Sequence, residues 1–139
     1  MAKLVLKFDE DDFDFVLIGI VTSHRDYRVS RDVNLALDIT LERTEDYSIV
    51  EKKRGQEIHF PFFKFTNEHE DQYFILGNKV ETGLLIPEQK QLDFFLMVKP
   101  GLSTIDRAEL VRMLKKDNRF QAVFPIEVAG LKSKQNLLF

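Results

Sequence analysis

The sequence contains no cysteine and no tryptophan, and its apolar runs are short. Without cysteine the chain forms no disulfide and no thiolate metal site, a composition that suits a reducing compartment such as the cytoplasm. The longest unbroken aliphatic and glycine stretch is 16–21, far below the roughly 20 residues that span a bilayer. Residues 1–8 hold too short an apolar run for a signal peptide. We therefore expect a soluble cytoplasmic protein that does not enter a membrane.

The sequence also has no large excess of positive or negative charge. The chain carries 20 Lys and Arg against 23 Asp and Glu, a net charge of −3. The short basic runs at 52–54 and 115–116 resemble solvated ends of elements, so the sequence argues against nucleic acid as a partner. None of the six glycines belongs to a phosphate-binding loop, and we expect no cofactor.

The sequence is rich in phenylalanine, with 13 Phe. A length of 139 residues predicts a single domain over residues 1–139. Alternating apolar residues predict strands at 3–8, 47–53, 57–65, 72–78, 92–99 and 120–128. Apolar residues at helical spacing predict helices at 24–38 and 103–116. Residues 13–21 fit either a strand paired with the first one or a short buried helix. The pattern favours an α+β fold, with an antiparallel sheet of about six to seven strands and both helices packed on one face.

Two local features refine this prediction. Ser23 and Ser103, each followed three residues later by Asp, resemble N-terminal caps of the two helices. Pro61 has no N–H for a ladder, so the strand at 57–65 is expected at a sheet edge or with a bulge. Such a bulge would bring four apolar side chains to a single face: Ile58, Phe60, Phe63 and Phe65.

The segment from Leu84 to Lys99 stands out because its pattern changes in the middle. Pro87 suits the first position of a helical turn, and the polar residues 88–91 are good helix formers. From Leu92 onward the period becomes two, which predicts a strand with Leu92, Phe94, Leu96 and Val98 on one face. Two carboxylates, Glu88 and Asp93, flank the change from turn to strand.

Ile86-Pro87-Glu88 and, after three free positions, Leu92-Asp93-Phe94 resemble the motif of the IPExxxVDY family of small bacterial proteins. Leu stands for the motif's Val and Phe94 for its Tyr. The resemblance extends to four further stretches: 17–20, 26–28, 41–46 and 131–134. It implies a shared fold but no chemistry, because the family has no assigned activity. Since Phe94 lacks the hydroxyl of a tyrosine, we expect this position to pack rather than react.

The candidate functional residues are those of the motif: Ile86, Pro87, Glu88, Asp93 and Phe94. Glu88 and Asp93 could form an acid–base pair if they converge with different pKa values. Alternatively, Asp93 accepts backbone N–H bonds at the strand junction, and Glu88 lies where a helical N-terminus favours its charge. The sequence supplies no second catalytic group that would decide for chemistry.

None of the three histidines, His24, His59 and His69, has the spacing of a metal ligand set, so we expect no metal site. His59, within the Phe-rich strand, is interpreted as structural, and Ser23 beside His24 as a cap rather than a nucleophile. The function itself stays open between two classes. One is a non-enzymatic binding or accessory module, and the other is a small hydrolase or lyase that uses Glu88 and Asp93.

A homodimer is expected on two grounds, although another protein could equally be the partner. Pro61 marks a possible Phe-rich edge strand, and the chain ends in the apolar Leu137-Leu138-Phe139. Either feature could instead fold back onto the chain's own core.

Overall fold

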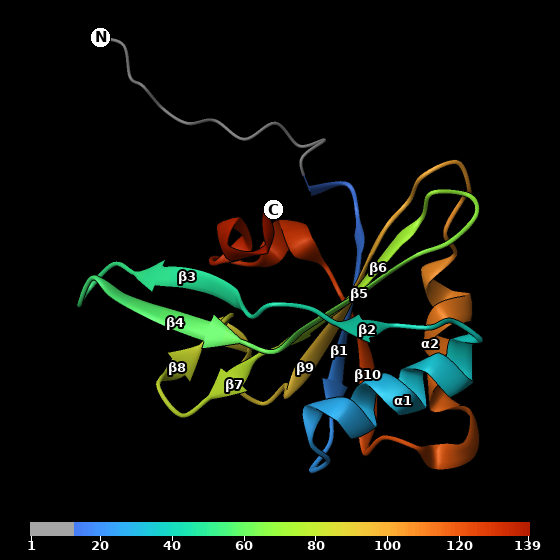
Figure 1. Cartoon of the computed structure of the whole chain (residues 1–139), viewed down its shortest axis with the longest axis horizontal. Coiled ribbons are helices and arrows are strands. Elements are labelled where there is room, and N and C mark those ends of the chain that lie inside the picture. Colours follow the sequence, from blue (N-terminus) through green and yellow to red (C-terminus); the bar gives the residue numbers. More distant parts are fainter. Residues whose placement is uncertain (1–12) are drawn as a thin grey trace, which may run out of the picture.

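The computed structural model describes residues 13–139, which form one large antiparallel sheet with two small two-stranded sheets beside it (Figure 1). The strands are β1 Val16–Val21, β2 Glu42–Arg43, β3 Tyr47–Glu51, β4 Gln56–Phe60, β5 Phe62–Thr66, β6 Gln72–Gly77, β7 Lys79–Val80, β8 Gly83–Leu84, β9 Phe94–Lys99 and β10 Ala122–Ile126. The helices are α1 Asp26–Leu37 and α2 Arg107–Lys115, with short 3-10 turns η2 Pro87–Gln89, η3 Lys116–Asn118, η4 Val128–Gly130 and η5 Lys134–Leu137. The main sheet has the order β10-β1-β9-β6-β5-β2, and the pairs β3-β4 and β7-β8 form the small sheets.

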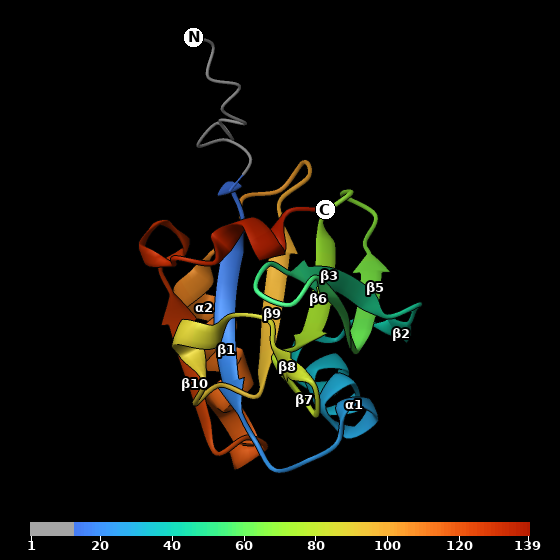
Figure 2. The ribbon, with the colours of Figure 1, turned by 90° about the vertical axis from the view of Figure 1, so that its left-hand side faces the viewer.

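Irregular segments cover one face of the main sheet (Figure 2). The β3–β4 hairpin, the segment that carries the Ile86-Pro87-Glu88 motif and the C-terminal segment after β10 all lie on this face. They contribute these buried apolar side chains: Ile58, Phe60, Leu85, Ile86, Leu92, Val128, Leu131 and Leu137. The sheet meets them with Leu17, Phe74, Leu76, Phe95 and Met97. This arrangement buries both faces of β9.

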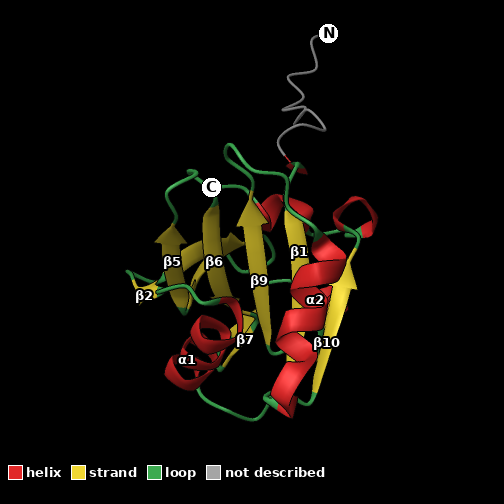
Figure 3. Cartoon of the chain, turned by 90° about the vertical axis from the view of Figure 1, so that its right-hand side faces the viewer, coloured by secondary structure: helices red, strands yellow, loops and turns green. Residues whose placement is uncertain are grey.

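The two helices cover the opposite face (Figure 3), and the predicted α+β architecture is confirmed. The apolar stripes of α1 and α2 pack on sheet residues such as Ile18, Ile75 and Leu96. Residues 13–21, which the sequence left open, contain strand β1, an internal strand of the main sheet between β10 and β9. The strand predicted at 3–8 lies outside the described residues. In the described structure β1 pairs with β9 on one edge and with β10 on the other.

Pro61 divides the Phe-rich stretch rather than bulging it, and here the sequence prediction was wrong. β4 pairs with β3, whereas β5 enters the main sheet between β6 and β2. As a result, Ile58 and Phe60 belong to the core under the hairpin, and Phe63 and Phe65 to the core under the helices. A residue without an N–H is tolerated where the chain leaves one ladder for another.

The predicted serine caps are also wrong. Helix α1 starts after Arg25 with no side-chain cap, and α2 is capped by Asp106, whose carboxylate accepts from the Glu109 N–H. Ser103 N–H instead points to Asp71. A serine three residues before an acid fits a cap by pattern, but several preceding positions compete for that role.

The apolar tail folds onto its own chain. The Phe139 ring lies 5.0 Å from the Tyr47 ring, 5.2 Å from that of Phe62 and 5.0 Å from that of Phe74. Lys99 Nζ donates to the Phe139 carbonyl oxygen over 2.6 Å. Because β5 is an internal strand and the tail is packed, both features that suggested a homodimer are used within the chain.

Candidate functional site

The motif lies between β8 and β9 and is mostly buried. Ile86 and Leu92 are fully buried under the irregular face, and Phe94 is buried on the helix-covered face. Pro87 and Glu88 are exposed in the turn η2. The sequence placed Leu92 and Phe94 on the same face, but the strand begins only at Phe94, so they lie on opposite faces.

A buried asparagine that the sequence analysis missed organises this segment. Asn78 is fully buried, and its side-chain Nδ2 donates to the carbonyl oxygens of Gln89 (2.9 Å) and Leu92 (2.8 Å). Its Oδ1 accepts from the Ile86 N–H over 2.8 Å. The bonds to the Ile86 N–H and the Leu92 carbonyl oxygen satisfy buried backbone groups of the irregular turn, and the Gln89 carbonyl oxygen accepts from the Leu92 N–H as well. The only signal in the sequence is a polar residue directly after an apolar strand.

At the other end of the motif, the Leu92 side chain packs closely against the backbone of Gly19. A Cβ on Gly19 of β1 would lie 2.4 Å from Leu92 Cδ1, so only glycine leaves room for the buried Leu92 side chain. Gly19 thus couples the internal strand β1 to the motif.

Glu88 is used to hold the C-terminal segment. Its carboxylate accepts from the Ser133 N–H (2.7 Å) and from the Ser133 hydroxyl (2.8 Å). Partial burial acts to raise the pKa of Glu88, but hydrogen bonds from the Ser133 and Lys132 segment outweigh it, and the pKa is lowered. A carboxyl group with a lowered pKa stays ionised and is poorly suited to act as a general acid at neutral pH.

Asp93 is used at a different junction. Its Oδ2 accepts from the Thr22 N–H over 2.9 Å, as the structural alternative in the sequence analysis predicts, and its Oδ1 lies 3.2 Å from Lys79 Nζ. Asp93 therefore ties the end of β1 to β7. Glu88 and Asp93 share no partner, so the geometry gives no sign of the convergent carboxylate pair that acid–base chemistry requires.

One Ser–His–Glu arrangement exists on the hairpin, again unforeseen from the sequence. Ser48 Oγ lies 2.6 Å from His59 Nδ1, and His59 Nε2 lies 3.1 Å from Glu57 Oε1. Ser48 and His59 are direct cross-strand partners, so their contact is what the register provides. All three side chains are exposed, none lines a described cavity, and we assign them to hairpin stability rather than to hydrolysis. The structural interpretation of His59 holds, although the side chain is exposed rather than buried.

The motif also borders a groove, called here the motif groove, of about 250 Å³. Its three walls are the hairpin, the β8–η2 segment and the C-terminal segment, all on the face seen in Figure 2. The lining residues are Ile49, Val50, Glu51, Lys52, Ile58, Leu84, Pro87, Lys132, Ser133, Gln135 and Asn136. Pro87 thus forms part of the groove directly, and Glu88 shapes it by holding Ser133.

Two further bonds fix the C-terminal wall of the motif groove. The Tyr47 hydroxyl donates to the Asn136 carbonyl oxygen, and Asn136 Nδ2 donates to the Leu85 carbonyl oxygen over 2.7 Å. Burial raises the pKa of Tyr47 to about 12, so the hydroxyl remains a donor at every physiological pH. The groove is therefore a preformed feature.

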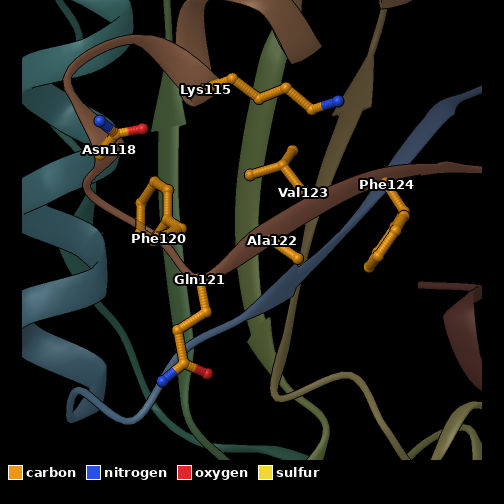
Figure 4. A pocket seen from close by; sticks show the side chains of 7 residues that line it. All are labelled: Lys115, Asn118, Phe120, Gln121, Ala122, Val123 and Phe124. Atoms are coloured by element: carbon orange, nitrogen blue, oxygen red, sulfur yellow. The ribbon is translucent and has the colours of Figure 1, made fainter.

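A second hollow, of about 330 Å³, lies between the end of α2 and β10 (Figure 4). It is lined by Lys115, Asn118, Phe120, Gln121, Ala122, Val123 and Phe124. No carboxylate or histidine lines it, and no motif residue reaches it, so it offers neither acid–base chemistry nor a link to the motif.

No protein-family model matches this chain, and no curated protein shows significant similarity to it. The resemblance to the IPExxxVDY family therefore stays a prediction from the motif. Within residues 13–139, no three His, Asp or Glu side chains are grouped so that they could hold a metal ion. Over the same range, neither helix has the length and apolar character needed to cross a bilayer.

Proposed function

We propose that this protein is a non-enzymatic binding or accessory module and that the motif groove is its binding surface. The observation that supports this most is the use of both motif carboxylates, Glu88 by Ser133 and Asp93 by Thr22 and Lys79. An enzyme would keep such groups directed toward a substrate. Here Glu88 holds Ser133 in the wall of the groove, and Asp93 ties the end of β1 to β7.

The size of the groove favours a protein partner. Sites for small molecules and cofactors occupy roughly 300–1,000 Å³, whereas the motif groove measures about 250 Å³. A volume of this order accommodates one or two side chains of a partner. The partner is either another protein or a second copy of this chain, acting in the cytoplasm, the compartment that the lack of cysteine suits. Membership in the IPExxxVDY family is part of the same proposal.

Site-specific photocrosslinking tests this function. A photoreactive amino acid replaces Val50, which lines the motif groove and is 62% exposed, or Leu35 on α1, which is 57% exposed and outside the groove. We expect adducts of defined mass at Val50, identified by mass spectrometry as another protein or as a dimer of this chain, and none at Leu35. Equal labelling at both positions, or no adduct at Val50, would contradict the proposal.

Light scattering over a dilution series then separates the two partners. A dimer that dissociates on dilution and is weakened by Val50→Asp, but not by Leu35→Asp, identifies the second copy. A chain that stays monomeric at high micromolar concentration excludes it and leaves another protein as the partner.

A further inference from the structure

We infer that the motif groove binds an extended acidic peptide segment, with an apolar side chain of the peptide in the groove and its carboxylates at Lys52 and Lys132. This inference rests on the proposed function, because it names the chemistry of the partner for the same groove. Three observations carry it: an apolar floor, and, among residues 13–139, a strand edge with no ladder partner and two cations with no ion-pair partner.

The open edge belongs to β3. In the described part of the chain β3 pairs with β4 alone, so its other edge has no ladder partner. Three residues of β3 in succession, Ile49, Val50 and Glu51, line the motif groove. An extended peptide that adds to such an edge gains backbone hydrogen bonds regardless of its sequence.

The floor of the groove is apolar. Ile49, Ile58, Leu84 and Pro87 line it, and Ile58 is buried beneath the hairpin. The volume of about 250 Å³ suits one or two apolar side chains, and successive side chains of a strand alternate in direction. One residue of the peptide would therefore enter the groove while its neighbours point toward the rim.

Charged side chains at the rim of the motif groove determine which charge is favoured on the neighbouring residues of the peptide. Lys52 and Lys132 are exposed, and neither forms an ion pair with any residue that the structure describes. The carboxylates nearby are engaged: Glu51 Oε1 lies 3.9 Å from Arg54 Nε, and Glu88 accepts from Ser133. Glu88 keeps its charge, but the three cations Lys52, Arg54 and Lys132 outnumber the two carboxylates Glu51 and Glu88, which leaves a net charge of +1. This surplus favours carboxylates on the peptide and raises the association rate at low salt.

The test titrates the full-length ¹⁵N-labelled chain with acetyl-Glu-Asp-Leu-Phe-Asp-Glu-amide. The matched peptide carries Gln and Asn in place of Glu and Asp. We expect amide shift changes at the β3 edge and at Lys132 to Asn136, and affinity for the acidic peptide at least about tenfold above that for the neutral one. Raising the salt concentration to about 0.5 M should remove most of this difference.

Charge reversal supplies the second arm. The pair Lys52→Glu and Lys132→Glu should lower the affinity for the acidic peptide at least about tenfold. The control pair Lys115→Glu and Lys116→Glu makes the same change in net charge at the end of α2 and should have little effect. All four side chains are exposed, so the fold is not at risk.

Equal binding of both peptides in the groove would overturn the acidic inference but support the proposed function. Shift changes confined to the helices, or no binding of either peptide, would also overturn the inference. In those two cases the photocrosslinking result at Val50 decides separately whether the groove binds protein at all.

Discussion

The two faces of the main sheet are covered by different means. On the helix-covered face, α1 and α2 satisfy their own backbone groups and need contribute only apolar stripes. On the opposite face, the hairpin, the motif segment and the C-terminal segment have little regular structure. They are held by polar side chains such as Asn78, Glu88 and Tyr47. The packing of these irregular segments on the sheet therefore depends on individual polar side chains. The motif groove lies on this same face.

The comparison predicts that the largest loss of stability comes from the polar anchor of the irregular face. Replacing Asn78 by Ala removes three hydrogen bonds and leaves the buried Ile86 N–H and Leu92 carbonyl oxygen without these partners. We expect a loss of about 3–5 kcal/mol in the free energy of unfolding, measured with urea.

Leu114→Ala, at a fully buried position on the helix-covered face, is expected to cost about 2–5 kcal/mol as a cavity. Hydrogen exchange distinguishes the two variants, because only Asn78→Ala should expose the Ile86 amide locally beyond the global loss. A cost below about 1 kcal/mol for Asn78→Ala would show that the comparison is wrong.

A second change tests the contact between strand β1 and the motif. Gly19→Ala places a Cβ 2.4 Å from Leu92 Cδ1, and such overpacking costs about 1–3 kcal/mol. Combining it with Leu92→Ala should relieve the clash, so the double variant is expected to be more stable than the sum of the single effects by at least about 0.5 kcal/mol. Strict additivity would mean that the two residues are not coupled.

A third change concerns the face under the helices. Phe94→Tyr introduces the tyrosine of the IPExxxVDY motif but adds a hydroxyl to a buried ring, and we expect a loss of up to about 1–3 kcal/mol by thermal unfolding. Any gain of a catalytic activity in this variant would contradict a packing role for the position.

The smallest effects are expected from carboxylates titrated by acid. Asp71 is buried, and burial acts to raise its pKa, but hydrogen bonds from Gly101, Asn67 and Ser103 outweigh this and lower it. The pKa of Glu88 is lowered in the same way. Each carboxyl binds fewer protons folded than unfolded. Its contribution is therefore complete above its ordinary pKa near 4 and is lost as the pH falls through the lowered value.

Asp71→Asn should flatten the loss of stability between pH 5 and pH 2, measured by urea unfolding. Glu88→Gln should flatten it less, because Glu88 is exposed and solvent reduces its contribution to below about 1 kcal/mol. An unchanged pH profile in Asp71→Asn would show that this carboxylate does not stabilise the loops it joins.

The sequence predicted the helix-covered face better than the other. Helical spacing located α1 and α2 to within a few residues, because the buried side of an amphipathic helix appears in the sequence as apolar residues three and four positions apart. The strand at 57–65 was misjudged, since period-two alternation does not say whether Pro61 bends one strand or separates two. The hydrogen-bond donors to Glu88 and Asp93, Ser133 and Thr22, lie 45 and 71 residues away along the chain. No local pattern encodes such contacts, so the candidate residues could be named but their roles could not.

The order of strands in the sheet has a consequence for how the chain folds during synthesis. β1 pairs with β9 and β10, so Leu17 can form its ladder contacts only after Met97 and Ile126 have been synthesised. At about 5–20 residues per second, roughly 5–20 s pass between the appearance of Leu17 and that of its last partner. During that interval β1 exposes apolar side chains destined for both cores. The nascent chain therefore has its greatest need of chaperone protection early, before either face of the sheet exists.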